Sequence, residues 1–404
     1  MLPPQICCVL SLCSFVLYSR RLNVNCILMI TLFSFCDIYT AIVYHQIIIF
    51  CNYLFSCILG KGVLFTHDEF VNGCYECVNK FSLKGQTQLH DSNGIDLGYN
   101  LYDDNHTLSC IDAQRVKWDF MFDTLGLKEN DSVIDVGCGY GEWLNYLKSR
   151  NINVCGVNMS VEQSKYIAKK YDIEVINDDW KNIIMSDKYS KYKSNYNAIT
   201  FMDTVEHYPS PFYKCHKERQ NMVYNEMFKL ANYFTKDDGK VLLSTIHTND
   251  KKWNLYSYFQ MYVLDHTMAG LYPTVSGDEL SQNAKKNGIH EVVRYDKTES
   301  YRYSAIKAEQ SWQFTSLFYI ATSLIRTHGL ISTVLLVFDS ILYDPAFLLR
   351  IVSTLCNSWM YWYGEYWNNP TFNEQLTLNN TFINVFMILY HKKHNNGRFQ
   401  CPKV

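Results

Sequence analysis

An excess of charge of either sign is missing from this chain of 404 residues. Lys and Arg number 37 against 39 Asp and Glu, which gives a net charge of −2. Proteins that bind nucleic acid usually carry a basic surface, so this balance offers no electrostatic case for nucleic acid as the main partner. Charged residues make up 19% of the chain and hydrophobic residues 48%. That composition allows a large core and argues against wholesale disorder.

A cysteine framework is missing as well. The lone C-x-x-C motif, from Cys74 to Cys77, has no second pair at zinc spacing. Seven of the 15 cysteines lie in the apolar N-terminal region, and the others are scattered: the seven are Cys7, Cys8, Cys13, Cys26, Cys36, Cys51 and Cys57. We therefore expect free thiols in a reducing compartment and no metal site.

The first 64 residues have very little charge. Their longest uncharged run, residues 38–60, is about 23 residues long, which is enough to span a bilayer. No basic segment precedes the first apolar run and no clear cleavage site follows it, so a cleaved signal peptide fits poorly. We predict a hydrophobic N-terminal extension, 1–64, with one or two membrane helices, followed by a linker, 65–98. A helical cap packed on the enzyme, or an extension that adds nothing to the fold, is the alternative.

Two common nucleotide fingerprints are also missing. A β-branched run ends in Asp135, and Gly137, Gly139 and Gly141 follow it just before a helix predicted over 142–150. This G-x-G-x-G spacing is neither the G-x-G-x-x-G of dinucleotide sites nor the Gly-Lys-Ser/Thr ending of phosphate loops. The order strand, glycine turn and helix brings the backbone against a ligand at a helix N-terminus. An acidic residue just before such glycines is typical of class I S-adenosylmethionine (SAM) methyltransferases, in which Asp135 would anchor the loop or the ligand's amino group.

Short β-rich runs alternate with helical segments from residue 99 onward. This alternation predicts βαβ units and a mostly parallel, Rossmann-like α/β sheet in a domain over 99–394. Ligands bind at the carboxyl ends of such strands, where Asp135, Asn158, Asp179 and Glu206 are expected. Predicted strands cover 154–158, 174–176, 197–202, 240–246, 289–295 and 382–390, and predicted helices cover 113–125, 161–171, 217–231, 253–271 and 277–287.

The apolar and aromatic stretch over 312–367 is interrupted by charges too often to favour a spanning helix. It predicts helices that roof an apolar pocket or lie in a membrane interface, which would form a lipid-facing cap on the domain.

Together these motifs resemble the cyclopropane-fatty-acyl-phospholipid synthases, with the mycolic acid and sphingolipid C-methyltransferases, over about residues 99–390. The most discriminating segment is Gly-Val-x-x-Ser-x-Glu-Gln over 156–163. Other methyltransferases place an acidic residue at the end of this strand, where this chain has Asn158. The resemblance gives the ribose contact to Gln163, which also completes a Ser-x-x-Gln capping box with Ser160. Further matching pieces are 101–104, 107–110, 113–114, 179–180, 206–207, 242–246 and 300–301.

The resemblance also implies roles for other residues. Ser109 and Gly137 would contact the methionine portion of SAM, and Asp179 and Trp180 the adenine. A bicarbonate ion serves this family as the general base, and the residues that would hold it here are Cys110, Glu206 and Tyr301. An anion held by a thiol, a carboxyl group and a phenol in an apolar pocket could take the proton released when the ring closes.

Two departures from the family pattern affect the ring-closing step more than SAM binding. Ser244 stands where the family usually has histidine, and the nearest histidine is His247. The segment between Cys110 and Ala113 is also shorter than usual.

The resemblance implies methyl transfer from SAM to unsaturated acyl chains of membrane lipids. A small-molecule amine or hydroxyl acceptor, or an inactive module that binds SAM or lipid, is the alternative. Asn158 begins a glycosylation sequon, but at a cofactor site it cannot accept a glycan, which favours a membrane-associated protein with a cytoplasmic catalytic domain.

Overall fold

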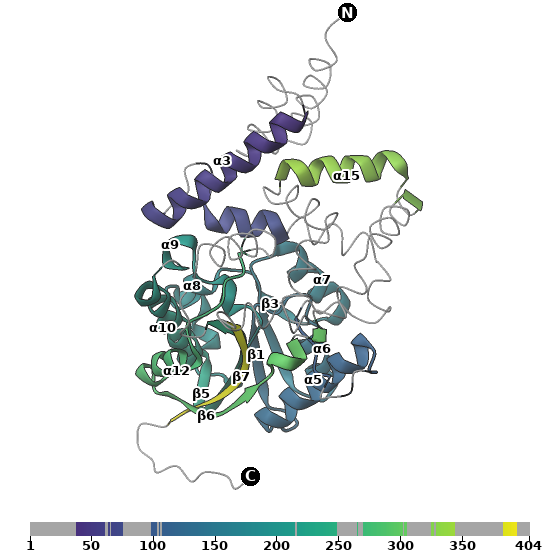
Figure 1. The fold of residues 1–404 in the computed structure, drawn as a ribbon. Coiled ribbons are helices and arrows are strands. Elements are labelled where there is room, and N and C mark those ends of the chain that lie inside the picture. The colour runs from purple at the N-terminus through teal and green to yellow at the C-terminus, as the bar shows by residue number, and fades with distance from the viewer. Residues whose placement is uncertain are drawn as a thin grey trace, which may run out of the picture.

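Seven strands form one sheet at the centre of the computed structural model (Figure 1). Their order is β3-β2-β1-β4-β5-β7-β6. Strands β1 to β5 pair in parallel, whereas β7 is antiparallel to both β5 and β6. The strands are β1 (Ser132–Val136), β2 (Asn153–Val157), β3 (Glu174–Ile176), β4 (Tyr196–Met202), β5 (Thr235–Thr248), β6 (Ile289–Asp296) and β7 (Ile383–Lys392). The predicted Rossmann-like α/β class is confirmed.

The structure describes part of the chain. The described residues are 38–60, 64, 66–75, 98–102, 105, 107–214, 216–248, 265, 270–301, 303–304, 325–326, 329–343 and 383–393. Most of the helix predicted over 253–271 and of the cap predicted over 312–367 lies outside these residues, as does the extension before residue 38.

Helices cover both faces of the sheet. They are α5 (Cys110–Leu125), α6 (Glu142–Lys148), α7 (Val161–Tyr171), α8 (Trp180–Ile183), α9 (Pro211–Lys214), α10 (Lys217–Phe234) and α12 (Gly277–Lys286). Successive strand residues point to opposite faces, so Val133 packs in one apolar cluster and Ile134 in the other. Helices α10 and α12 belong to the cluster of Ile134, and α5 and α6 belong to the cluster of Val133.

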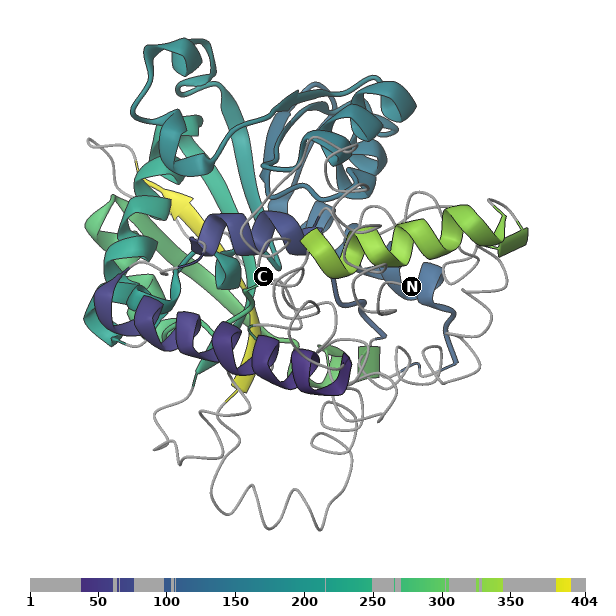
Figure 2. The same cartoon turned by 90° about the horizontal axis from the view of Figure 1, so that it is seen from above.

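Among the described residues before 99, two segments are helical. Helix α3 (Ile38–Leu59) contacts α9 (Figure 2), and none of the helices in the described ranges is long and apolar enough to cross a membrane. The membrane-spanning helix predicted at 38–60 does form a helix, but this helix is not long and apolar enough to cross a membrane. Within the linker predicted over 65–98, residues 67–75 form a helix where the sequence suggested a loop. Thr66 and Glu69 form a reciprocal capping box at its start: Thr66 N donates to Glu69 Oε2 at 2.7 Å, and Glu69 N donates to Thr66 Oγ1 at 3.2 Å.

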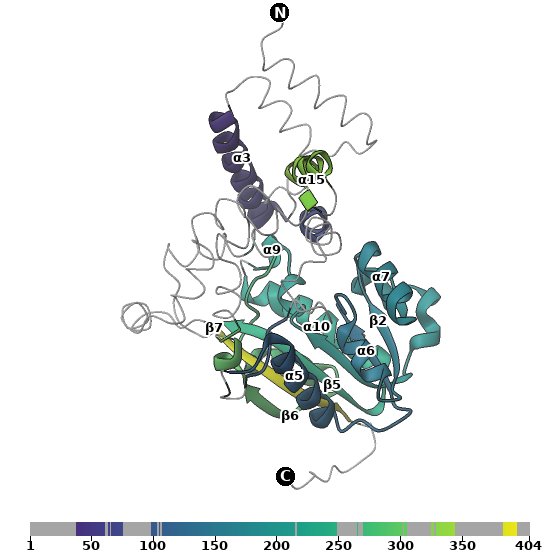
Figure 3. The same ribbon diagram turned by 90° about the vertical axis from the view of Figure 1, so that its right-hand side faces the viewer.

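Helices α3 and α15 (Leu330–Tyr343) lie at the end of the molecule where the carboxyl ends of the parallel strands lie (Figures 1 and 3). Ligands of open α/β sheets bind at this end. The N-terminal helices and α15 are thus placed near any site that the strand ends form.

A substitution at Gly141 tests how closely α7 packs against the glycine turn. Its φ is +79°, and a Cβ there would lie 2.8 Å from Ile167 Cγ1. Gly288 has a similar φ of +72° with nothing within 4 Å of such a Cβ, so it is the matched control. We expect Gly288→Ala to cost about 1 kcal/mol of unfolding free energy through the left-handed backbone, and Gly141→Ala about 1–3 kcal/mol more through overpacking. Chemical denaturation measures both, and equal losses would contradict the close approach of α7.

Candidate functional site

The glycine turn lies directly after β1, and its three glycines differ in how closely other atoms approach them. A Cβ on Gly137 would lie 2.4 Å from Thr204 Cγ2, so this glycine, like Gly141, is required by packing. Gly139 has φ +51° and nothing within 4 Å of an added Cβ. Of the three predicted glycines, Gly139 is therefore the one that faces open space, where a ligand could approach the backbone.

Asp135 is a buried residue of β1, two positions before the first glycine of the turn. Its side chain is 4% exposed, and its Oδ1 accepts a hydrogen bond from Thr200 Oγ1 on β4 at 2.6 Å. This bond joins β1 to β4, and the anchoring of the loop or of a ligand's amino group by Asp135 stays a prediction.

Asn158 connects the glycine turn to helix α7. Its Nδ2 donates to the Gly139 carbonyl at 2.9 Å and to Gln163 Oε1 at 3.0 Å. Ser160 caps α7 by accepting from Gln163 N at 3.3 Å, as the sequence predicts. The structure therefore brings Gly139, Asn158 and Gln163 together at the end of β2, with both polar side chains buried.

Asp179 and Trp180 lie beyond β3 at the start of α8. Asp179 caps this short helix by accepting from Lys181 N at 3.0 Å. Trp180 is buried and stacks on Tyr208, with ring centroids 4.7 Å apart and an interplanar angle of 27°. The Tyr208 hydroxyl lies 3.3 Å from Thr204 Oγ1, which joins this aromatic pair to the neighbour of Gly137. Nothing in the sequence marks Tyr208, because one tyrosine among 31 has no distinguishing pattern.

Glu206 is the buried carboxyl group of the site. It lies in a one-turn helix, η2 (Val205–His207), and is 2% exposed. Its Oε2 accepts a hydrogen bond from Thr245 Oγ1 at 2.8 Å. Burial first, and the negative charge of Asp203 second, raise the pKa of Glu206 to about 8. A carboxyl group with a pKa near neutrality is suited to exchanging protons with a substrate.

Ser244, which replaces the family histidine, is part of a buried polar network. Its Oγ donates to Asp203 Oδ1 at 2.9 Å and lies 3.1 Å from the Tyr99 hydroxyl. Tyr301 contacts the edge of the Tyr99 ring, with centroids 5.7 Å apart. His247 lies three residues after Ser244 on β5 and does not take the histidine's place, because its Nδ1 lies 3.0 Å from the Val275 carbonyl.

Ser109 and Cys110 lie at the start of α5, and their implied roles stay predictions. Ser109 caps α5, since its Oγ accepts from Asp112 N at 3.1 Å and donates to Asp112 Oδ2 at 2.7 Å. Cys110 is exposed, and its sulfur lies 3.7 Å from the Tyr102 hydroxyl. The Tyr301 ring contacts the Tyr99 ring, and Glu206 is close enough to interact with Tyr99 through its charge. Cys110 contacts a different tyrosine, Tyr102.

Of the implied bicarbonate holders, Cys110 thus contacts Tyr102, Tyr301 contacts Tyr99, and Glu206 accepts from Thr245. Among the described residues there is also no group of three or more His, Cys, Asp or Glu side chains that could hold a metal ion.

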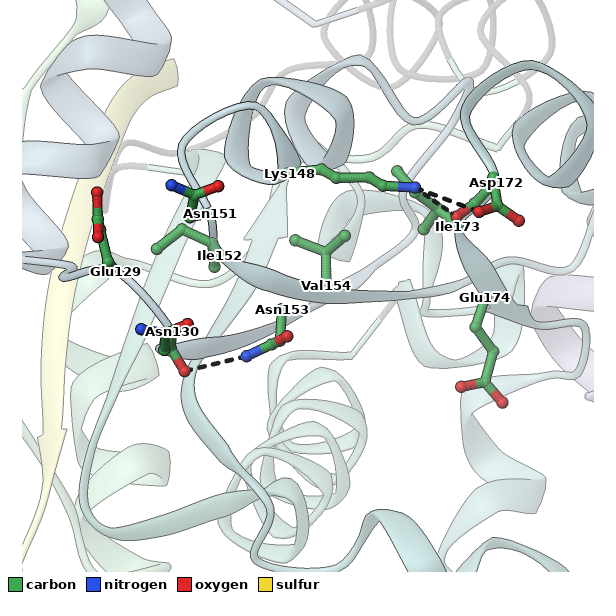
Figure 4. A pocket seen from close by; sticks show the side chains of 10 residues that line it. All are labelled: Glu129, Asn130, Lys148, Asn151, Ile152, Asn153, Val154, Asp172, Ile173 and Glu174. Carbon is green, nitrogen blue, oxygen red and sulfur yellow. Dashed lines mark hydrogen bonds and ion pairs between the residues drawn. The ribbon is translucent and has the colours of Figure 1, made fainter.

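A polar hollow of about 400 Å³ lies at the opposite end of the strands (Figure 4). Lys148 borders it and donates to the carbonyl oxygens of Tyr171 and Asp172 at 2.8 and 2.7 Å. Its lining comes from the amino ends of β2 and β3 and the turn before β1: Glu129, Asn130, Lys148, Asn151, Ile152, Asn153, Val154, Asp172, Ile173 and Glu174. None of the predicted site residues lines it, so this hollow is not the candidate site.

A protein-family model matches more than half of the chain. Residues 100–312 match the family described as mycolic acid cyclopropane synthetase. Cyclopropane mycolic acid synthase 2 of Mycobacterium leprae is 27% identical over 153 residues, which are 37% of this chain and 48% of that protein. A ubiquinone biosynthesis O-methyltransferase of Leptothrix cholodnii is 26% identical over 164 residues, 40% of this chain and 63% of that protein. The match to the mycobacterial relative thus spans about half of that protein's length.

Solved structures share the fold. The cyclopropane synthase MmaA2 of Mycobacterium tuberculosis superposes with a TM-score of 0.55 at 14% identity, covering 81% of this chain and 98% of that one. A mycolic acid cyclopropane synthase solved with SAH and CTAB gives a TM-score of 0.53 at 16% identity, covering 80% and 97%.

The raised pKa of Glu206 has a consequence for stability that needs no substrate. The folded protein holds a proton on Glu206 up to about pH 8, whereas an unfolded chain releases it near the ordinary value of 4.5. Stability is therefore lost as the pH rises from about 4.5 to about 8. We expect Glu206→Gln to raise the melting temperature relative to the unmodified protein, by a margin that grows over this range and is constant above it.

Melting curves from pH 4.5 to 9 measure this margin. Glu162→Gln, at an exposed position on α7, is the control and should show no such growth. A Glu206→Gln margin that does not change with pH would contradict the buried, protonated carboxyl group.

Proposed function

This chain belongs to the mycolic acid cyclopropane synthetase family, and from that premise we propose that it is a SAM-dependent C-methyltransferase acting on unsaturated acyl chains of membrane lipids. The observation that carries the proposal is a buried carboxyl group, Glu206, at the same strand ends as an open glycine turn. The relatives and solved structures named above include proteins called cyclopropane synthases, which supports the lipid acceptor.

The residues present fit SAM. Gly139 leaves room at the glycine turn, and Asn158 and Gln163 offer buried amide groups beside it. The Trp180 ring, stacked on Tyr208, offers an aromatic surface for adenine, and Asp179 precedes it at the helix start. When bound, SAM supplies a methyl group activated by its positively charged sulfur.

Glu206 provides the base that the lipid reaction needs. With SAM and an unsaturated chain bound, the alkene's π electrons would form the new C–C bond to the methyl group, and the electrons of the broken S–C bond would stay on sulfur. The ionised carboxylate of Glu206 then takes a proton from the added methyl carbon, and the released C–H electrons close the ring. Thr245 orients this carboxylate through its hydrogen bond. Because the carboxylate must be ionised, the rate rises as the pH increases through about 8.

The exposed apolar side chains of α3 and α15 support a lipid surface as the partner. Helix α3 contains no Asp, Glu, Lys or Arg, and Ile58 at its end is 72% exposed. Ile331 on α15 is 77% exposed. Further exposed apolar residues on the two helices are Tyr44, Ile47, Phe50, Leu54, Phe55, Leu59, Leu330, Val334, Leu335 and Phe338. Apolar helix faces beside a site for acyl chains are suited to a membrane interface on the cytoplasmic side, which we propose as the protein's location.

Mass spectrometry of total lipids tests this function. In cells that express the protein and receive methyl-labelled methionine, we expect a labelled gain of one CH₂ on unsaturated acyl chains. Glu206→Gln should abolish the gain, because an amide cannot take the proton, and Glu218→Gln, at an exposed position on α10, should retain it. Loss of the double bond would indicate a ring, and a retained double bond would indicate a methyl branch. Label in a soluble amine or hydroxyl product, with none in lipid, would contradict the proposal.

A further inference from the structure

The helix over residues 67–75 packs directly on the turn that carries Glu206. The Tyr75 ring contacts the edge of the His207 ring, with centroids 6.1 Å apart. The helix buries the side chains of its own residues Phe70, Val71 and Cys74. The Thr66–Glu69 capping box fixes its first turn, and His67 is the first residue of that turn.

His67 contacts the backbone next to Glu206. The ring lies close enough to the His207 backbone for a hydrogen bond that raises the pKa of His67, which makes the ring the donor. Burial, and next the charge of Lys214, nevertheless lower the pKa of His67 to about 3. The ring is therefore neutral near pH 7, and its single N–H is used on His207. The remaining nitrogen, Nε2, is shielded from water and has no hydrogen-bond partner in the described part of the chain.

A second connection runs from His67 through Gly270 to the same turn. A Cβ on Gly270, whose φ is +85°, would lie 2.9 Å from His67 Cε1. The Gly270 carbonyl accepts from Lys214 Nζ at 2.8 Å, and Lys214 forms a fully buried ion pair with Asp265. Two residues further on, Tyr272 N donates to the Glu206 carbonyl at 3.1 Å. The backbone of η2 is thus held from one side by His67 and from the other by the 270–272 segment.

We propose that His67 is a positioning residue for Glu206, through which the N-terminal helix 67–75 holds the catalytic turn in place. This inference rests on the proposed function for its effect on turnover, but the contact itself is independent of it. The sequence offers no sign of this role, because His67 is 139 positions before Glu206 and far outside the matched residues 100–312.

Several titratable groups surround the two residues. Four groups interact with Glu206 through charge: Asp203, Tyr99, Tyr208 and Tyr224. Three groups interact with His67 in the same way: Lys214, Asp265 and Lys181. Since these groups are common to all the variants compared below, a difference among the variants reports on position 67.

Three variants of the full chain test the proposal: His67→Ala, His67→Asn and Asn72→Ala. Asparagine keeps an N–H donor at the position of the ring Nδ1, so it is the conservative replacement. Asn72 is exposed on the same helix and serves as the control.

Hydrogen exchange of the unliganded protein is the first measurement. In His67→Ala we expect faster exchange at the amides of His207, Tyr208 and Tyr272, which lie in or against η2. His67→Asn should restore slow exchange, and Asn72→Ala should match the unmodified protein. Unchanged exchange at these amides, or a uniform increase across the whole domain that asparagine does not reverse, would overturn the proposal.

Turnover is the second measurement. We expect His67→Ala to lower kcat by about 10- to 100-fold while leaving KM for SAM unchanged, because a misplaced group affects chemistry more than cofactor binding. Water admitted beside Glu206 should also lower its pKa, so the rising limb of the rate against pH should move below 8. His67→Asn should recover most of both. A lower rate with an unmoved limb would contradict positioning of Glu206. Absence of turnover in the unmodified protein would refute the proposed function, and hydrogen exchange alone would then decide the role of His67.

Discussion

Strand β1 is hydrogen-bonded in parallel to β2 on one side and to β4 on the other, and the site depends on this pairing. The register places Asp135 opposite Gly156 of β2 and Thr200 of β4. Because the three strands run in the same direction, the turns that leave them converge at one edge of the sheet. The glycine turn, Asn158 and η2 are brought together by this geometry alone, although the sequence separates them by up to about 70 residues.

The polar groups gathered at this edge oppose stability. Asp135, Asp203 and Glu206 are carboxyl groups with buried or half-buried side chains, and burial disfavours their ionised forms. Hydroxyl groups offset part of that cost: Thr200 donates to Asp135, Ser244 to Asp203 and Thr245 to Glu206. Each donor comes from β4 or β5, so the central strands supply both the core of the domain and the groups that make its site tolerable. A site of this kind is expected to lower stability in exchange for a base poised near neutral pH.

The sequence predicted the elements that local patterns specify. The glycine spacing, the polar residues at strand ends and the Ser160 cap each follow from a few adjacent residues, and the structure confirms their placement. The resemblance implies a cofactor contact for Ser109, and the structure adds that Ser109 caps α5 through Asp112. The helix over 67–75 was missed although Thr66 and Glu69 spell a capping box, because the polar composition around them suggested a loop. Contacts across long separations, such as Tyr99 with Ser244 or His67 with His207, leave no local pattern to find.

We propose that SAM binds in the open space beside Gly139, and calorimetry of SAM binding to the unmodified chain and to Gly139→Ala tests this most directly. A Cβ at this position meets no protein atom within 4 Å, so the variant should fold with only the small cost of a left-handed alanine. We predict that the unmodified protein binds SAM and that Gly139→Ala, still folded by circular dichroism, binds it far more weakly, because the added methyl group occupies the ligand's space. Equal affinity in the two proteins would place SAM elsewhere and contradict the account.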